Sequence, residues 1–205
     1  MKKLLYFFVR MLAVNSTGCN TQNADSSQSA DSTFKQFEDV FLDAYWQQYP
    51  AASILIGYGK YYDKLVMPDS SAVANNISFS KQWIDSLNRQ NYQKLNDNNK
   101  ISFNIIKNQL ESDSWYQSVF KQYEWDASLY NLCGECYYLI NQPWAALDDR
   151  LKTLSNHLEH AQDYYQAALN ILYRPTNEHV ELAILQNQGG LSVFGKSWAD
   201  SWKAY

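Results

Sequence analysis

The sequence is poor in the residues that build turns, with 7 glycines and 4 prolines among 205 residues. Collagen-like, low-complexity and turn-rich all-β chains need these residues at frequent intervals, so their scarcity argues against all three. Val- and Ile-rich segments with the alternation typical of strands are also scarce. Three cysteines are too few for a small fold held together by disulfides.

The chain carries no excess of positive charge. Its 17 Lys and Arg residues against 21 Asp and Glu residues give a net charge of −4. A surface that binds nucleic-acid phosphates has to be basic, so we expect no nucleic-acid partner. No segment after residue 14 is apolar enough to cross a bilayer as a helix, which requires about 20 apolar residues.

Aromatic residues are abundant, with 7 Trp, 16 Tyr and 9 Phe making up 16% of the chain. Hydrophobic residues amount to 46%, which is enough for a sizeable buried core. Tyr and Trp combine an apolar body with a polar tip, so their excess fits a cleft that binds a peptide or a carbohydrate. A core and its rim are the more frequent use of such residues, and both interpretations stay open.

The N-terminus has the features of an export signal. Two lysines precede an apolar stretch at 4–14, which is too short for a membrane span but suits a signal-peptide core. Gly18 directly before Cys19 resembles the end of a bacterial lipoprotein signal, in which the cysteine receives the lipid. We therefore predict a signal peptide at 1–19 and a membrane contact through lipid on Cys19. The expected location is the bacterial cell envelope, on the periplasmic or outer-membrane face.

Two residues depart from the usual lipoprotein signal: Arg10 interrupts the apolar core, and Ser16 stands where leucine is common. The alternative is a signal that is cleaved or retained without lipid. Residues 20–32 are rich in Ser, Asn, Gln and Asp and contain no large apolar side chain. Such a segment cannot bury enough surface to fold, so we expect a disordered tether there and a helical domain at 33–205.

Apolar residues recur at helical intervals through most of this domain. The spacing in Thr33-Phe34-Lys35-Gln36 is that of a capping box, which predicts a first helix from Thr33 to Tyr49-Pro50. Asp97 is the predicted cap of a later helix. The further helices are predicted at 71–89, 97–110, 115–139 with at least one break, and 176–188. For the short apolar segment 51–57 a helix is favoured and a strand is the alternative. The predicted fold class is all-α.

The clearest periodicity lies at 143–172. Apolar or small residues follow one another there at alternating steps of three and four from Trp144 to Leu172, which is the pattern of a heptad seam. A helix of about 30 residues extends about 45 Å, so it has to pack lengthwise against partner helices. We expect these partners within the same domain, in a fold of long packed helices, and an oligomeric coiled coil is the alternative.

The histidines and cysteines form no recognised metal motif. His157-Leu158-Glu159-His160 is neither HExxH nor HxxEH and lacks a third ligand. We predict that both histidines are solvated or lie at the rim of the core, and that the chain holds no metal. Cys133-Gly134-Glu135-Cys136 lacks the preceding strand of a thioredoxin-type motif. Small core residues are the favoured interpretation, and a disulfide is the alternative in an exported protein.

Motifs for nucleophilic catalysis are absent, since the sequence has no GxSxG, no P-loop and no GxGxxG. The acidic pairs Asp148-Asp149 and Glu178/Glu181 fall on helix faces that we expect to be solvated. We therefore assign no catalytic residue and no metal ligand in this chain.

Several stretches follow one another in a characteristic order between about residue 34 and residue 194: Phe41-Leu42-Asp43-Ala44-Tyr45-Trp46-Gln47-Gln48-Tyr49-Pro50, Gly57, Tyr62-Asp63-Lys64-Leu65, Ser128-Leu129-Tyr130-Asn131, Arg150-Leu151, and Val180-Glu181-Leu182-Ala183-Ile184-Leu185-Gln186-Asn187-Gln188-Gly189. In order and spacing they resemble the N-terminal part of a bacterial family, the domain-of-unknown-function 885 family. The resemblance covers most of this chain but under half of a typical family member.

Full-length members of that family are often exported lipoproteins and resemble helical zinc carboxypeptidases. The resemblance implies a larger helical, peptidase-like fold, in which an HExxH helix of the C-terminal half holds the metal and a peptide is the substrate. This sequence contains no HExxH, so no metal ligand and no catalytic glutamate carry over, and we expect no cofactor in this chain. The end of the chain agrees with a truncation, because one helical face there carries Phe194, Trp198, Trp202 and Tyr205.

Together these features predict an N-terminal fragment of an exported lipoprotein that resembles a metal-dependent carboxypeptidase. The fragment itself is expected not to be catalytic, and its helices would form one wall of a substrate cleft in the intact protein. The alternative is a self-contained, non-enzymatic helical lipoprotein that binds a peptide or protein partner. A degraded or shortened reading frame without a functional product is a third hypothesis.

Overall fold

The structure is a computed structural model that describes residues 21–194. Within these residues it contains helices and no strand, which confirms the predicted all-α class. None of the described helices combines the length and the apolar character needed to span a bilayer. The α-helices are α1 (Thr21–Gln48), α2 (Pro50–Leu55), α3 (Ser70–Asn88), α4 (Asp97–Trp115), α5 (Cys133–Asn141), α6 (Leu147–Glu159), α7 (Ala161–Ile171) and α8 (Asn177–Leu191).

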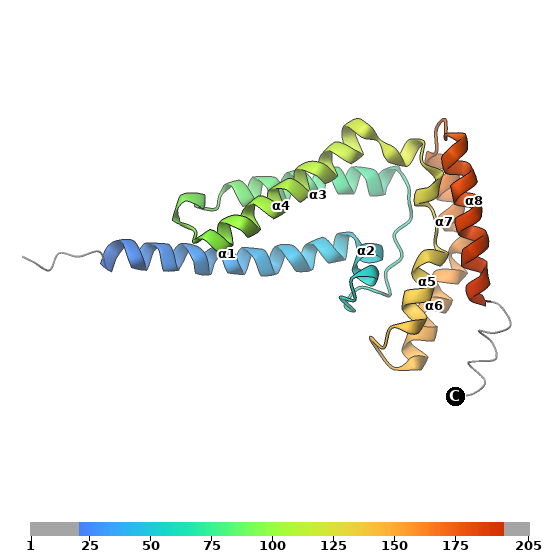
Figure 1. Cartoon of the computed structure of the whole chain (residues 1–205), viewed down its shortest axis with the longest axis horizontal. Helices are drawn as coiled ribbons and strands as arrows, with labels where there is room; N and C mark the ends of the chain where they lie inside the picture. Colours follow the sequence, from blue (N-terminus) through green and yellow to red (C-terminus); the bar gives the residue numbers. More distant parts are fainter. Residues whose placement is uncertain (1–20, 195–205) are drawn as a thin grey trace, which may run out of the picture.

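The first helix group consists of α1 and the antiparallel pair α3–α4, which lies along it (Figure 1). Large apolar side chains of all three helices form the shared core, and burial of each such side chain contributes roughly 1.5–3 kcal/mol. The buried members of this core are Phe34, Phe41, Leu87, Leu95, Phe103, Ile106 and Leu110.

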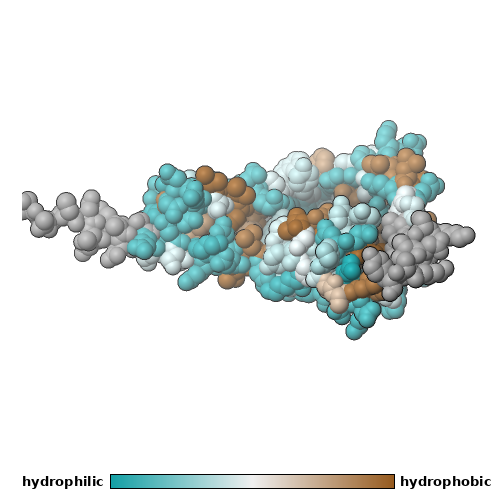
Figure 2. Space-filling view, turned by 60° about the horizontal axis from the view of Figure 1, so that its bottom comes forward, coloured by the Kyte–Doolittle hydropathy of each residue, from teal (hydrophilic) through white to brown (hydrophobic). Residues whose placement is uncertain are grey.

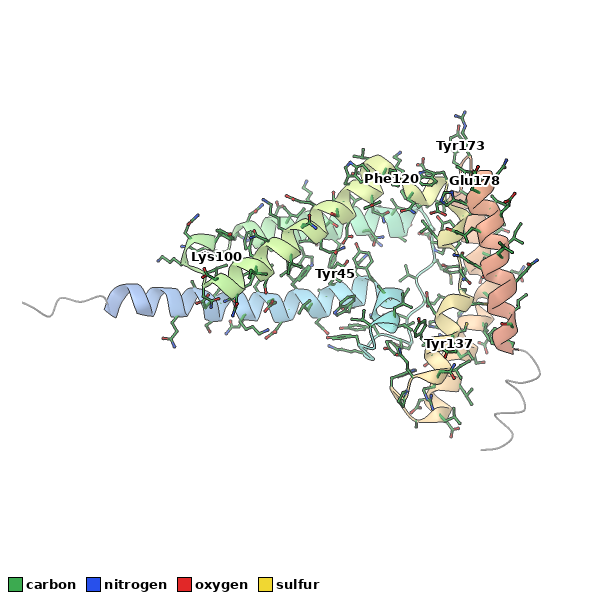
Figure 3. All side chains as sticks on the ribbon, viewed as in Figure 1. Tyr45, Lys100, Phe120, Tyr137, Tyr173 and Glu178 are labelled. Atoms are coloured by element: carbon green, nitrogen blue, oxygen red, sulfur yellow. The ribbon has the colours of Figure 1, made fainter. Side chains whose placement is uncertain are left out.

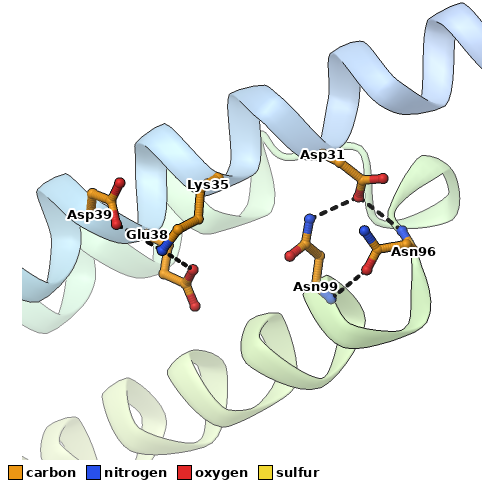
Figure 4. A network of polar contacts seen from close by, with 6 residues as sticks. All are labelled: Asp31, Lys35, Glu38, Asp39, Asn96 and Asn99. Atoms are coloured by element: carbon orange, nitrogen blue, oxygen red, sulfur yellow. Dashed lines mark hydrogen bonds and ion pairs between the residues drawn. The ribbon is translucent and has the colours of Figure 1, made fainter.

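A polar network fixes the start of α4 on α1 (Figure 4). Asp31 Oδ1 accepts hydrogen bonds from the Asn96 backbone N–H at 2.9 Å and from the Asn99 side chain at 2.8 Å. Asn96 Oδ1 in turn accepts a hydrogen bond from the Asn99 backbone N–H at 2.9 Å. Asn96 is therefore the cap of α4, and the prediction that Asp97 caps this helix is wrong by one residue.

The second helix group, α5–α8, stands across one end of the first group (Figure 1). Its core has two clusters, one between α5 and α6 and one around α7, with the buried members Cys136, Ile140, Leu154, Tyr130, Leu132, Tyr164 and Ala168. A third cluster of Ile54, Tyr62 and Leu139 joins α2 and the segment after it to α5. The two groups are therefore connected by packed apolar side chains.

Much apolar surface stays exposed on the second group. No residue of α8 is buried, and its apolar residues Leu182, Ile184, Leu185 and Leu191 are 44–66% exposed. Figure 2 shows one face of the molecule, on which apolar patches are spread among hydrophilic side chains.

The first helix is longer than its sequence pattern predicts. It begins at Thr21, so the predicted start at Thr33 is wrong, and residues 21–32 are helical in the structure instead of forming a disordered tether. The Thr33 hydroxyl donates to the Ser29 carbonyl at 2.9 Å, as a Thr inside a helix does. Ala30 packs against the core of the first group, which gives the extra turns a tertiary contact.

The single helix predicted at 143–172 is also wrong. The structure has α6 and α7 there, interrupted at His160 with φ −97° and ψ 7°. The two halves of the apolar stripe pack against different parts of the chain: Leu154 lies in the cluster of Ile140, whereas Ala168 lies in the cluster of Leu132. These different partners explain why one straight helix does not cover the whole stripe.

The remaining predicted elements are present with shifted ends. The segment predicted at 115–139 breaks after Trp115 into a π-helical turn at 116–120 and 3-10 turns at 122–124 and 127–129 before α5 begins. The last helix continues through Gly189-Gly190 to Leu191, beyond its predicted end at Gln188.

Candidate functional site

A cavity lies where the two helix groups meet, and we call it the junction cavity. Its volume is about 250 Å³, and it is lined by residues 48–52 and 64–66, by Asn76 of α3, by Glu135 of α5 and by Tyr164 of α7. Both helix groups and the segment between them therefore contribute walls, so the site depends on how the groups are joined.

Glu135 supplies the acidic group of the junction cavity. It lies in the first turn of α5, and its side chain is 16% exposed. The Nδ1 atom of His157 lies 3.9 Å from Glu135 Oε2, which is beyond hydrogen-bond distance. Burial raises the pKa of Glu135 to about 7, with no hydrogen bond from the described residues to lower it. The carboxyl therefore exchanges its proton near neutral pH.

His157 lies behind Glu135 and is completely buried, so the prediction that it is solvated or at the rim is wrong. His160 is exposed, as predicted. Neither ring nitrogen of His157 has a hydrogen-bond partner of good geometry. Burial lowers the pKa of His157, against a smaller opposing effect of the Tyr62 backbone. The imidazole next to Glu135 is therefore neutral near pH 7.

Two tyrosines form aromatic walls of the junction cavity. Tyr164 is buried, and this burial together with the nearby Glu135 carboxyl raises the pKa of its phenol. The Tyr49 hydroxyl is buried without a hydrogen-bond partner, and burial raises its pKa as well. The Tyr49 ring lies 4.7 Å from that of Tyr45, which is positioned between α1 and the α3–α4 pair (Figure 3) and donates to Asp113 Oδ2 at 3.2 Å. Both cavity phenols therefore stay neutral.

Lys64 is the basic residue among those that line the junction cavity. Its Nζ atom lies 4.8 Å from the centroid of the Tyr61 ring, which is a cation–π distance. Within the described part of the chain, no ion pair joins Lys64 to Glu135. The acid inside the cavity and the base at its edge are thus not paired with each other.

Residues 21–194 contain no group of three or more His, Cys, Asp or Glu side chains placed to hold a metal ion. Glu135 and His157 form a pair only, whereas zinc sites use three or four protein ligands. The described residues therefore do not fit a zinc site. The junction cavity instead offers a single carboxyl group, that of Glu135.

A second constellation joins Thr176, His179 and Asp126 at the start of α8. Thr176 Oγ1 lies 2.6 Å from His179 Nδ1, and His179 Nε2 lies 3.7 Å from Asp126 Oδ2. The order of hydroxyl, imidazole and carboxylate is that of a nucleophilic triad, but 3.7 Å is too long for the hydrogen bond that orients the imidazole. The Thr176 backbone N–H also donates to the Trp125 carbonyl at 3.2 Å. We interpret this constellation as a structural link that fixes the first turn of α8.

Cys133 and Cys136 are free thiols in the structure. Cys136 is buried in the cluster of Ile140 and Leu154, as predicted for a core residue. Burial raises the pKa of Cys136 to about 12 and raises that of the partly exposed Cys133 as well. Because the thiolate is the reactive form, neither cysteine is activated as a nucleophile. A disulfide between them stays an untested alternative.

The acidic pairs predicted to be solvated are exposed in the structure: Asp148, Asp149, Glu178 and Glu181. Figure 3 shows Glu178 projecting from α8. The predicted lipid anchor and the last members of the C-terminal aromatic face lie outside the described residues: Cys19, Trp198, Trp202 and Tyr205.

No family model matches the chain, and the comparison with curated proteins finds no match. The resemblance to the domain-of-unknown-function 885 family therefore stays a prediction. A solved structure does match, that of a "putative lipoprotein of unknown function" from Shewanella oneidensis, with a TM-score of 0.74 and 36% sequence identity. The match covers 80% of this chain and 30% of that protein's chain. This chain thus spans less than a third of the length of the protein that it matches.

Neither Glu135 nor Tyr164 stands among the residues predicted to form a site. The sequence does hold one signal for the first of them, because Glu135 is the single charged residue in the stretch 127–147. An isolated charge in an apolar and aromatic segment indicates a buried acid. No comparable signal points to Tyr164, which is one of 16 tyrosines.

Proposed function

We propose that this chain is the N-terminal, helical part of a longer lipid-anchored protein of the bacterial cell envelope. The observation that carries the proposal is the match to the Shewanella oneidensis protein, whose name describes a lipoprotein and whose chain extends far beyond the matched 30%. The leader with Gly18-Cys19 supports the same assignment from the sequence. The lipid on Cys19 would hold the helical domain at the membrane surface.

Cys19→Ala is expected to abolish lipid attachment. In a Gram-negative host fed radiolabelled palmitate, the wild-type protein should carry the label and sediment with the membranes. The Cys19→Ala protein should carry no label, because the acceptor thiol is gone, and should accumulate in the soluble fraction or as the uncleaved precursor. Cys133→Ala is the matched control, since it removes a thiol from the helical domain and should leave labelling unchanged. An unlabelled wild-type protein, or a labelled Cys19→Ala protein, would contradict the proposal.

The finer part of the proposal concerns the whole protein, which we infer to resemble a metal-dependent peptidase. Support comes from the order of the motifs that resemble the domain-of-unknown-function 885 family. Since residues 21–194 contain no group of three or more His, Cys, Asp or Glu side chains placed to hold a metal ion, the metal would be held by residues outside this range. The helices of this chain would then form one wall of the substrate cleft.

The purified chain is accordingly expected to hydrolyse no peptide, with or without added zinc. Its activity is measured on a mixture of unmodified peptides by mass spectrometry, with and without a chelator. A genomic frame that continues past Tyr205 and encodes HExxH would supply the longer protein as the positive sample. Zinc-dependent cleavage by the purified chain alone would overturn the proposal.

A second candidate is a self-contained, non-enzymatic binding protein, and the junction cavity favours it because residues of this chain line the cavity from both helix groups. A monodisperse monomer that unfolds in a single cooperative transition would support this candidate. Aggregation through the exposed apolar residues of α8 would instead support the larger protein.

A further inference from the structure

We propose that the junction cavity binds a primary ammonium group, of the kind carried by a lysine side chain or by the amino terminus of a peptide. The carboxyl of Glu135 would accept its hydrogen bonds, and the rings of Tyr49 and Tyr164 would flank it. This inference goes beyond the proposed function and does not depend on the lipid anchor.

The size of the junction cavity limits the occupant to a small group. Its volume of about 250 Å³ corresponds to roughly eight water molecules at about 30 Å³ each. Pockets for drug-sized ligands usually start at about 300 Å³. The cavity therefore suits an alkylammonium chain the length of a lysine side chain, while the rest of a larger ligand stays outside.

The charge of the occupant follows from the unpaired state of Glu135. A carboxylate with 16% of its side chain exposed is costly unless a cation or hydrogen-bond donors reach it. His157 does not meet this need, because it is 3.9 Å away and burial keeps its imidazole neutral. An ammonium group brings three N–H donors and the opposite charge.

The walls of the junction cavity are suited to the remainder of such a group. Cations are attracted to the faces of aromatic rings, and Tyr49 and Tyr164 line the cavity from opposite helix groups. Pro50, Leu65 and Val66 add apolar surface that can contact the methylene groups of an alkylammonium chain. The Glu135 carboxylate would repel a small anion.

Lys64 is the residue of this chain whose own ammonium group can compete with a ligand for the Glu135 carboxylate. Its ammonium lies over the Tyr61 ring and is not paired with Glu135, although the residue lines the cavity. If a ligand's ammonium occupies the cavity, Lys64→Gln should bind it at least as tightly as the wild type, because one repelling charge is removed. If Lys64 instead fills the site in solution, this variant should gain affinity many-fold, and ammonium recognition by Glu135 still holds.

The test is a titration of the purified chain at pH 8 with n-butylamine, which is a cation at this pH, and with n-butanol as its neutral counterpart of similar shape. Binding is followed by NMR shifts of the Glu135 and Tyr164 signals. We expect saturable binding of butylamine, weaker binding of butanol by at least about tenfold, and a loss of at least about tenfold in Glu135→Gln. Glu159→Gln, at an exposed carboxylate of α6, is the matched control and should bind as the wild type does.

A pH series separates charge recognition from simple filling of the cavity. The groups that face Glu135 are His157 of α6, Tyr164 of α7, Cys136 of α5 and Lys64 of the connecting segment. Butylamine should bind about tenfold more weakly at pH 5.5 than at pH 8, because Glu135 is protonated at the lower pH.

The proposal is overturned if butylamine fails to bind, if butanol binds equally well, or if Glu135→Gln keeps the wild-type affinity. If butylamine fails to bind but the protein still carries the palmitate label and sediments with the membranes, the ammonium proposal is overturned and the lipid-anchor proposal stands.

Discussion

Replacing Glu135 with Gln is expected to stabilise the protein at pH 8 by about 3 kcal/mol and to leave its stability at pH 4 nearly unchanged. In the folded protein the pKa of Glu135 is about 7, against an ordinary value of 4.5. The folded state therefore holds this proton more tightly than the unfolded state does. This tighter proton binding stabilises the folded protein fully below pH 4.5, and the stabilisation is lost as the pH rises through 7. One pKa unit corresponds to about 1.36 kcal/mol of stability.

Glutamine has the shape of the protonated carboxyl and cannot ionise, so the Glu135→Gln protein does not lose stability at this position as the pH rises. The measurement is denaturant unfolding followed by tryptophan fluorescence at several pH values between 4 and 8, for the wild type and Glu135→Gln. Glu159→Gln is again the control, because it changes an exposed carboxylate and should shift the free energy of unfolding by less than about 0.5 kcal/mol at each pH. Equal effects of Glu135→Gln at pH 4 and pH 8 would show that Glu135 is not a buried acid.

Two neighbouring glycines of α8 are expected to respond to alanine with opposite signs. A Cβ atom at Gly190 would lie 2.4 Å from the Cβ of Cys133, which is the first residue of α5. This neighbour is attached directly to the backbone and cannot rotate away, so α5 and α8 have to move apart. Overpacking of this kind costs about 1–3 kcal/mol. At Gly189 no atom lies within 4 Å of the added Cβ, and Gly→Ala inside a helix stabilises by roughly 0.5–1 kcal/mol.

Thermal or denaturant unfolding of Gly190→Ala and Gly189→Ala measures this contrast directly. In the Gly190→Ala background, Cys133→Gly should recover part of the lost stability, since it removes the atom that the new methyl group meets. Stabilisation by both alanine substitutions would mean that α8 does not pack on α5 as the structure has it.

The helical class and most helix positions could be predicted because they rest on local patterns. The steps of three and four that mark α3 and α4 concern residues on one face of one helix, and Asp69 caps α3 through its own side chain, which accepts from the Ala72 N–H at 2.8 Å. The scarcity of glycine and proline excluded sheet-rich folds by a similarly local argument.

The features that escaped prediction depend on residues far apart in the sequence. The interruption at His160 follows from the different partners of Leu154 and Ala168, which no local pattern encodes. The extension of α1 depends on the pairing of Asp31 with the start of α4, 65 residues later. The burial of Glu135 likewise requires that the two helix groups meet at the junction cavity. Periodicity places a side chain on a helix face, and only the tertiary partners decide whether that face is covered.

The existence of a buried, unpaired acid in the junction cavity is most directly tested by measuring the pKa of Glu135 itself. Carbon-detected NMR of the protein with ¹³C-labelled glutamate gives the titration of each side-chain carboxyl, and the signal missing from Glu135→Gln assigns the resonance. A midpoint near 7 is the predicted result. A midpoint near the ordinary glutamate value of 4.5 would contradict the burial of Glu135 and the cavity built around it.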